Sequence, residues 1–391
     1  MKIELHIIQN FAPSNLNRDD TGAPKDCEFG GYRRARISSQ CLKRAVRRTF
    51  REDGLLPEER LGIRTKRVLS EIVNRLAADG HSPEEAKTVA TSGLAAMGLA
   101  LAKEDKTQYL LFLSPAEIDT MVSLCKSHWT ALLDMAPGDG SKGTKAAKKA
   151  GKVAAPKEVS AAFNSVLLDG KRAADLALFG RMLADKADKN IDAAAQVAHA
   201  ISTHRVQADF DYFTAVDDLK PDDNQGADMI GTVPFNSACM YRYANVDLAE
   251  LVKNLDGDQE LAIQVVRAFI DASVKAIPTG KQTSMAAQNP PSLVMVVLRE
   301  HGLWSLANAF VKPVQPNRED DLVEASVARL DKYWGDLSSM YGDDEILGAW
   351  VATTAGGSLK ALESNRVGKL GDLLSSVDRA LQGGVKAGAR L

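Results

Sequence analysis

The sequence predicts a mixed α+β fold, and three features of its pattern carry this prediction. The chain begins with alternating apolar residues over about residues 2–9, which is typical of a strand. Helical periodicity alone follows between about residues 60 and 135. From about residue 176 onward, strand-like and helix-like segments alternate, as they do where helices cover a split α+β sheet.

The predicted elements follow one another along the chain in two groups. The first group contains a strand over 2–9, a short strand before a helix that starts at Ser39, and helices near 60–79, 83–103 and 115–135. The second group contains strands at 176–183, 206–217, 232–245 and up to 298, with helices near 191–203, 247–275, 320–337 and 358–382. No internal repeat is visible, so any repetition would come from copies of the whole chain.

Length and composition fit an ordinary globular protein. A chain of 391 residues is expected to hold a core with a large insertion, or two domains. The four cysteines show neither metal-ligand nor disulfide spacing, which suits a reducing cytosol. The start lacks a signal-peptide pattern, and the apolar stretch from Val89 is too short to span a bilayer. We therefore expect a cytoplasmic protein without membrane contact.

A basic segment stands out against a net charge of only -2. Residues 33–51 contain eight arginines and lysines and no acidic side chain. On a helix from Ser39, Leu42 and Val46 share one arc, while the cations fall on the opposite arc. Ser38 or Ser39 is expected to cap the helix, whose free N–H groups would favour a phosphate. The alternative is a solvated basic face.

The residues before this helix strengthen the first interpretation. Gly30 and Gly31 allow close backbone approach, and a short strand after them places Tyr32, Arg34 and Arg36 on one face. Cations with an aromatic ring among them are the composition expected of a site for single-stranded nucleic acid.

Two further stretches have biased composition. Residues 137–156 are rich in Gly, Ala and Lys, which predicts either a basic loop that contacts a nucleic-acid backbone or a solubilising linker. Residues 209–228 contain seven aspartates and one lysine, with aromatic residues at the start. A loop of this length inside a compact domain is more often functional than not, although a plain solvent loop is the alternative.

Five ordered motifs carry a family resemblance. They are LNRDD at 16–20, FGGYRRARISSQCLKRA at 29–45, IDAAAQVAHAISTH at 191–204, FTAVDDL at 213–219 and YRYANV at 241–246. Together they resemble the CasC subunit of the type I-E Cascade CRISPR surveillance complex, a member of the RAMP superfamily. The similarity covers nearly the whole chain and is weak between about 55 and 170.

The resemblance implies a hand-shaped backbone protein that wraps CRISPR guide RNA (crRNA). It implies an RRM-like (ferredoxin-like) palm with a helical finger insertion and a thumb hairpin. The expected parts are palm at 1–55, finger at 56–170, palm at 171–204, thumb at 205–235, and palm with C-terminal helices at 236–391.

The resemblance also implies site residues. Six polar residues match the positions that contact guide phosphates: Arg18, Ser38, Gln40, Lys43, Arg44 and Arg47. Met182 and Phe213 match apolar residues beside displaced nucleotides. Lys142, Lys145, Lys148 and Lys149 fall in the region of the finger that touches target DNA. Tyr32 and Pro221 are not required by the family.

Partners follow from the same resemblance. They are crRNA, target DNA, other copies of the chain, and the large, small, end-capping and crRNA-processing subunits of Cascade. No cofactor, metal or catalytic residue is expected. Sequence recognition would belong to the guide and not to the protein.

Two rival functions remain open. Paired carboxylates at Asp19-Asp20 and Asp217-Asp218 could hold Mg²⁺ in a guide-dependent RAMP ribonuclease, although ion-paired scaffolding is the commoner use of such residues. His199 and His204 are five residues apart on a predicted helix, which does not suit zinc. The run around Lys281 is similar to a P-loop but lacks its first glycine and its Ser/Thr. The second rival is a stand-alone nucleic-acid-binding regulator.

Overall fold

The computed structural model describes residues 1–135, 156–166, 173–183, 187–214, 230–317 and 320–386. The chain forms two compact units. The first unit contains residues 1–55, 195–249 and 259–391, and the second contains residues 56–194 and 250–258. Among the helices of the described residues, none is long and apolar enough to cross a membrane.

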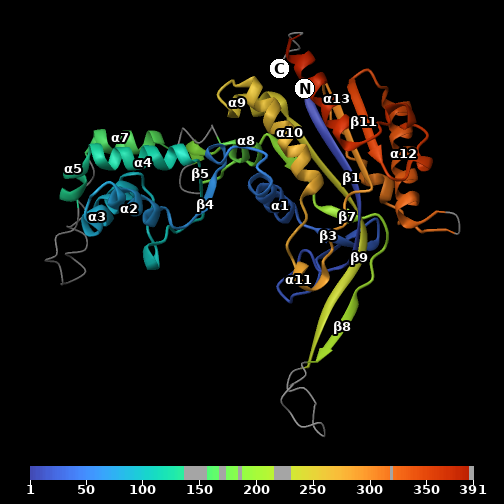
Figure 1. Cartoon of the computed structure of the whole chain (residues 1–391), viewed down its shortest axis with the longest axis horizontal. Coiled ribbons are helices and arrows are strands. Elements are labelled where there is room, and N and C mark those ends of the chain that lie inside the picture. Colours follow the sequence, from blue (N-terminus) through green and yellow to red (C-terminus); the bar gives the residue numbers. More distant parts are fainter. Residues whose placement is uncertain (136–155, 167–172, 184–186, 215–229, 318–319, 387–391) are drawn as a thin grey trace, which may run out of the picture. The chain divides into compact units, whose positions relative to one another are not determined.

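One large sheet organises the first unit (Figure 1). Its hydrogen-bonded order is β11-β10-β1-β9-β7-β3-β2, and β6 and β8 also pair with β9. The strands are β1 (Lys2–Ser14), β2 (Asp26–Phe29), β3 (Tyr32–Ile37), β6 (Ala195–Val197), β7 (Ala200–Ser202), β8 (Asp209–Thr214), β9 (Ile230–Asp247), β10 (Leu293–Arg299) and β11 (Ile346–Thr353). All the strand pairs are antiparallel.

The centre of this sheet has ferredoxin-like topology. Along the chain, β1, α1 (Ser39–Glu52), β7, β9, α10 (Gln259–Lys275) and β10 follow as βαββαβ. In space the four strands lie in the order β10-β1-β9-β7, which places the fourth strand beside the first and the third beside the second. This arrangement is the split βαβ pattern of the RRM-like palm, and the predicted α+β class is confirmed.

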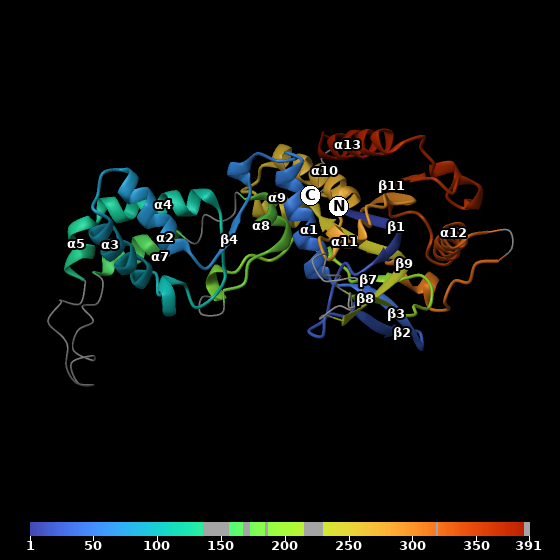
Figure 2. The same cartoon turned by 60° about the horizontal axis from the view of Figure 1, so that its bottom comes forward.

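Helices cover both faces of the sheet. Alternation along β1 sends Ile3, Leu5 and Ile7 to one face and Ile8 to the other, and all four are buried. α1 and α10 pack against each other, and α12 (Leu322–Tyr341) contributes to the core that contains Ile8. α13 (Leu370–Lys386) contacts β11 and α10. Figure 2 shows α13 at the top of this unit and the β2–β3 hairpin at the bottom.

A two-stranded ribbon extends from the sheet (Figure 1). The first residues of β9 pair with β8, from Asp209 opposite Phe235 to Thr214 opposite Ile230. From Asn236 onward, β9 pairs with β1 instead. One strand of 18 residues therefore belongs to both the ribbon and the central sheet.

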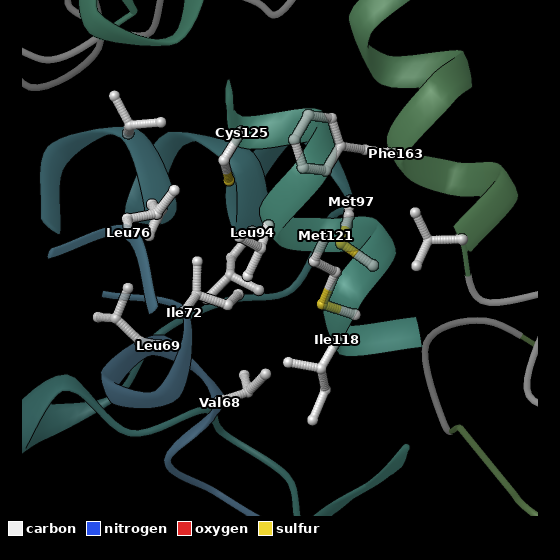
Figure 3. Close-up of a cluster of buried hydrophobic side chains, with 14 of the residues drawn as sticks. Val68, Leu69, Ile72, Leu76, Leu94, Met97, Ile118, Met121, Cys125 and Phe163 are labelled. Atoms are coloured by element: carbon white, nitrogen blue, oxygen red, sulfur yellow. The ribbon is translucent and has the colours of Figure 1, made fainter. Parts of the chain in front are cut away.

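The second unit is mainly helical. Its elements are β4 (Ile63–Thr65), α2 (Val68–Ala78), α3 (Pro83–Ala96), β5 (Leu111–Leu113), α4 (Pro115–Ser127), α5 (Trp129–Asp134), α7 (Lys157–Val166), α8 (Ala174–Phe179) and the end of α9 (Leu248–Asn254). Figure 3 shows its core, in which Leu76, Leu94, Met121 and Phe163 come from four helices. Gly93 permits this packing, because a Cβ there would lie 2.9 Å from the Phe163 ring.

Three sequence-based element predictions are wrong. The helix expected at 191–203 is instead β6 and β7, which both pair with β9 of the sheet. The strand expected at 176–183 is α8, which Gly180 ends with a φ of 74°. The helix expected at 358–382 begins only at Leu370. The strands β2, β4, β5 and β11 were not predicted, and β4 occupies part of the stretch expected as a helix near 60–79. The finger, palm and thumb boundaries stay predictions.

Candidate nucleic-acid interface

α1 forms one wall of the candidate site, and its sequence explains its geometry. The side chain of Ser38 accepts a hydrogen bond from Cys41 N and so caps the helix as expected. The Asn17 side chain accepts a hydrogen bond from Ser38 N at 2.8 Å, which joins the helix start to the loop after β1. Leu42, Val46 and Phe50 are buried, so the polar arc of α1 is turned away from the core.

A pocket of about 470 Å³ lies beside this arc. The loop after β1 supplies Arg18, and the turn after α10 supplies residues 278–280. α1 contributes Cys41, Arg44, Ala45 and Arg48. The turn approaches the loop very closely, because a Cβ on Gly280 would lie 2.4 Å from the Leu16 carbonyl oxygen. Glycine at this position therefore sets the width of the pocket.

The pocket has more cationic than anionic side chains. Arg18 and Arg44 are exposed and make no ion pair within the described part of the chain. Arg44 Nη1 donates only a long hydrogen bond of 3.5 Å to Thr279 Oγ1. Arg48, by contrast, pairs with Glu52. Two guanidinium groups are thus available to an anionic ligand.

The carboxylate of Asp19 is occupied by its own turn. Its Oδ1 accepts hydrogen bonds from Thr21 Oγ1, Thr21 N and Ala23 N at 2.8–3.0 Å. These bonds, above all the one from the Thr21 hydroxyl, lower the pKa of Asp19. Asp19 forms no ion pair with Arg18, so the expected ion-paired scaffold is instead a hydrogen-bonded turn.

Three more of the predicted phosphate-binding residues lie along α1. Gln40, Lys43 and Arg47 are three or four positions apart and therefore share a face of the helix. Gln40 is exposed, and Arg47 is half-buried. Lys43 is also half-buried, and this burial lowers the pKa of its ammonium group. All six predicted phosphate contacts therefore lie on α1, at its N-cap Ser38 or on the loop joined to its start.

Arg34 of β3 is not exposed, although the sequence pattern predicted that it would lie on the nucleic-acid-binding face of this strand. Its guanidinium is fully buried and donates to the backbone carbonyls of Ser202, Thr203, Phe310 and Val311 at 2.7–3.1 Å. Four carbonyl dipoles replace water around the charge, so Arg34 fastens β3 to two distant segments. Tyr32, on the same strand, is exposed.

The ribbon presents aromatic side chains on both of its faces. Phe210 and Tyr212 are 69% and 63% exposed and share one face, because side chains alternate along β8. Phe213 is 40% exposed on the other face. Its ring lies over Gly231, where a Cβ would be only 2.3 Å from the ring. The alternative of a buried core phenylalanine at 213 is therefore wrong.

In the second unit, Met182 is exposed to solvent between two buried neighbours. Its side chain is 83% exposed, whereas Arg181 and Leu183 are 5% and 8% exposed. Arg181 Nη1 pairs with the buried Glu117 at 2.7 Å. Hydrogen bonds between Arg181 and Ile191 in both directions fix the backbone here. The buried pair thus anchors the segment that presents an apolar side chain to solvent.

Comparison with known proteins identifies the family of this chain. A family model described as CT1975-like protein matches residues 3–376. The chain belongs to the CT1975-like protein family. No curated protein matches it.

Two solved structures are similar to this CT1975-like chain. A chain of a "CRISPR RNA-guided surveillance complex, pre-nicking" has 30% identity and a TM-score of 0.83, with 97% of this chain and 100% of that chain covered. A chain of a "CRISPR RNA-guided surveillance complex" has 27% identity and a TM-score of 0.71, with the same coverage. The predicted similarity to CRISPR surveillance complexes is confirmed, while type I-E and CasC stay predictions.

Several predicted residues of the CT1975-like chain lie outside the described residues. They are the finger lysines Lys142, Lys145, Lys148 and Lys149, the pair Asp217-Asp218, and Pro221. Sequence reasoning missed Asn17 and the turn at 278–280. The turn belongs to the run around Lys281 that is similar to a P-loop, and Gly280 is the residue of this run that indicates a close backbone approach.

The two histidines considered as zinc ligands have separate environments. His204 accepts a hydrogen bond from Cys239 N and contacts the Arg205 carbonyl oxygen, so both ring nitrogens are used. His199 is exposed and contacts Arg36. Within the described part of the chain, no group of three or more His, Cys, Asp or Glu residues could hold a metal ion.

Proposed function

We propose that this chain is a non-catalytic backbone subunit of a CRISPR surveillance complex of type I-E Cascade. In this function it binds crRNA, assembles with further copies of itself along the guide, and presents the guide to target DNA. The observation that carries the proposal is the pocket at α1, with two arginines that make no ion pair, in a chain of which 97% is similar to a chain of an RNA-guided surveillance complex.

The pocket suits a phosphodiester backbone better than a base. Its free cations are guanidinium groups, which bind phosphate oxygens through paired N–H donors. It is also open and polar, without the exposed aromatic platform that base stacking requires. Binding of this kind does not depend on sequence, which is appropriate for a protein that must accept any guide.

The apolar positions complete the proposed mode of binding. Phe213 on the ribbon and Met182 in the second unit are both exposed, as wedges beside displaced nucleotides need to be. The Phe213 ring packs over Gly231, and the backbone next to Met182 is fixed by hydrogen bonds between Arg181 and Ile191. Target DNA would be contacted by the lysines at 142–149, and the other partners would be the large, small, end-capping and crRNA-processing subunits.

Arg44→Ala tests RNA binding directly. The affinity for single-stranded RNA is measured as a function of salt, and loss of one phosphate contact should reduce the log-log slope by about 0.7. Arg267→Ala is a matched control, because Arg267 lies on α10 of the same unit and pairs with Asp378 at 2.7 Å. Equal slopes for the two variants would overturn the proposal.

Incubation with Mg²⁺ and RNA complementary to the guide tests the absence of catalysis. Asp19 already accepts three hydrogen bonds from its turn, so we expect no cleavage by the wild-type complex. Metal-dependent cuts that Asp19→Asn abolishes would instead support the guide-dependent ribonuclease. Purification as an RNA-free monomer at low salt would support the stand-alone regulator.

A further inference from the structure

Arg36 and His199 form a second cationic site next to the pocket. Arg36 lies on β3, opposite Ile201 of β7, and His199 lies in the turn between β6 and β7. Arg36 Nη1 is 3.1 Å from His199 Nδ1. Arg36 Nε donates a hydrogen bond to the Asp26 carbonyl oxygen at 3.1 Å. The guanidinium is therefore fixed by two neutral acceptors.

The charge of Arg36 is not compensated by the protein. Within the described residues, neither Arg36 nor the neighbouring Lys25 has a carboxylate within ion-pair distance. Arg33, three positions earlier on the same strand, does have one, because its Nε donates to Asp26 Oδ2 at 2.7 Å. The protein thus neutralises Arg33 and leaves the half-buried Arg36 without a carboxylate partner.

The contact with Arg36 determines which ring nitrogen of His199 carries the proton. A guanidinium can only donate, so Nδ1 of the imidazole must accept, and the ring proton is on Nε2. Partial burial, together with the charges of Arg36 and Lys25, lowers the pKa of His199 and favours this neutral form. His199 therefore offers a single N–H donor on the side of the ring opposite Arg36.

This cluster is continuous with the pocket at α1. Lys25 and Arg36 line a small cavity together with Leu16 and Asn17, and these last two residues also line the larger pocket. Lys25 N donates to the Asn17 carbonyl oxygen at 2.8 Å. Leu16 and Asn17 therefore connect the pocket that holds Arg18 and Arg44 to the cavity that holds Lys25 and Arg36.

We propose that Arg36, with His199 Nε2–H, binds a phosphodiester of the guide adjacent to the one bound at α1. This inference rests on the proposed function and adds a subsite to it. The free guanidinium N–H groups supply the charge. The imidazole supplies a neutral donor that fixes the position of a phosphate oxygen, and it also orients Arg36 through Nδ1.

The test uses the full chain and an oligouridylate long enough to span both sites, with affinity measured across a salt series. Arg36→Gln should lower the log-log slope by about 0.7, whereas Arg36→Lys should keep the slope. Arg33→Gln is the matched control, since Arg33 is paired on the same strand, and it should behave as wild type. Melting curves of all variants verify that each is folded.

Two histidine variants separate binding from positioning. His199→Asn keeps an acceptor for Arg36 but loses the outward N–H, and His199→Ala loses both. We expect a several-fold loss of affinity in each, with unchanged slope for His199→Asn. Wild-type affinity in His199→Asn would overturn the contact with RNA. A wild-type slope in Arg36→Gln, when Arg44→Ala lowers it, would overturn the subsite alone. An unchanged slope in both would overturn the proposed function.

Discussion

Gly280→Ala should disturb the α1 pocket more than any removal of a single charge. The new Cβ would lie 2.4 Å from the Leu16 carbonyl oxygen and 2.7 Å from the Asn15 carbonyl oxygen. Both are backbone atoms, so no side chain can rotate away. Either the turn at 278–280 or the loop after β1 must move, and overpacking of this kind typically costs about 1–3 kcal/mol.

The displaced turn also changes RNA binding. The loop that would be pushed carries Arg18, and the turn carries Thr279, to which Arg44 donates. We therefore expect Gly280→Ala to lower the free energy of unfolding by about 1–3 kcal/mol and to weaken RNA binding in the folded protein.

Urea unfolding and RNA titration measure the two effects separately. Gly357→Ala is the matched control, because a Cβ at that glycine would meet nothing within 4 Å. The reasoning is refuted if Gly280→Ala unfolds at the same urea concentration as Gly357→Ala and binds RNA with wild-type affinity.

Two further predictions concern a buried histidine and the ribbon. Burial lowers the pKa of His6 from 6.5 to about 3, so its contribution to stability is complete above pH 6.5 and is lost as the pH falls toward 3. The slope approaches about 1.36 kcal/mol per pH unit only once the unfolded imidazole is mostly protonated. Urea unfolding should therefore show a loss of roughly 2.3 kcal/mol between pH 6.5 and 4.5 that is absent in His6→Asn; parallel curves would contradict this. Phe213→Ala should leave the melting temperature of the RNA-free chain nearly unchanged, because the ring is 40% exposed, yet lose about 1–3 kcal/mol per stacked base and shorten assemblies on RNA; a large fall in melting temperature with normal assembly would contradict it.

Local sequence patterns predicted those elements of the first unit whose structure depends on residues close together in the chain. The amphipathic helix after Ser38 and the alternating strand at the N-terminus both carry their signal within one element. The segment at 191–203 shows the limit. Its alanines favour a helix in isolation, but pairing of Ala195 and Ile201 with β9 satisfies the backbone in the sheet.

The candidate site could be predicted only in part, because it also depends on contacts between residues far apart in the chain. The cations of α1 are visible in the sequence, whereas the wall at Gly280 comes from a turn more than two hundred residues away. Arg34 and Arg36 look alike on a strand of alternating cations. Only the tertiary structure separates them, because the carbonyls that surround Arg34 come from residues 202–203 and 310–311.

The continuity of β9 restricts how the reach of the ribbon can change. Residues 230–235 pair with β8 and residues 236–247 pair with β1, without a break between them. A single inserted residue in β9 would reverse its side chains and exchange inner for outer faces on one side of the insertion. An insertion at the base of the ribbon therefore keeps the faces of the ribbon only if it adds two residues to each strand, which is a step of about 7 Å. The pleat of β9 thus sets the increments by which the length of the β8–β9 ribbon can change.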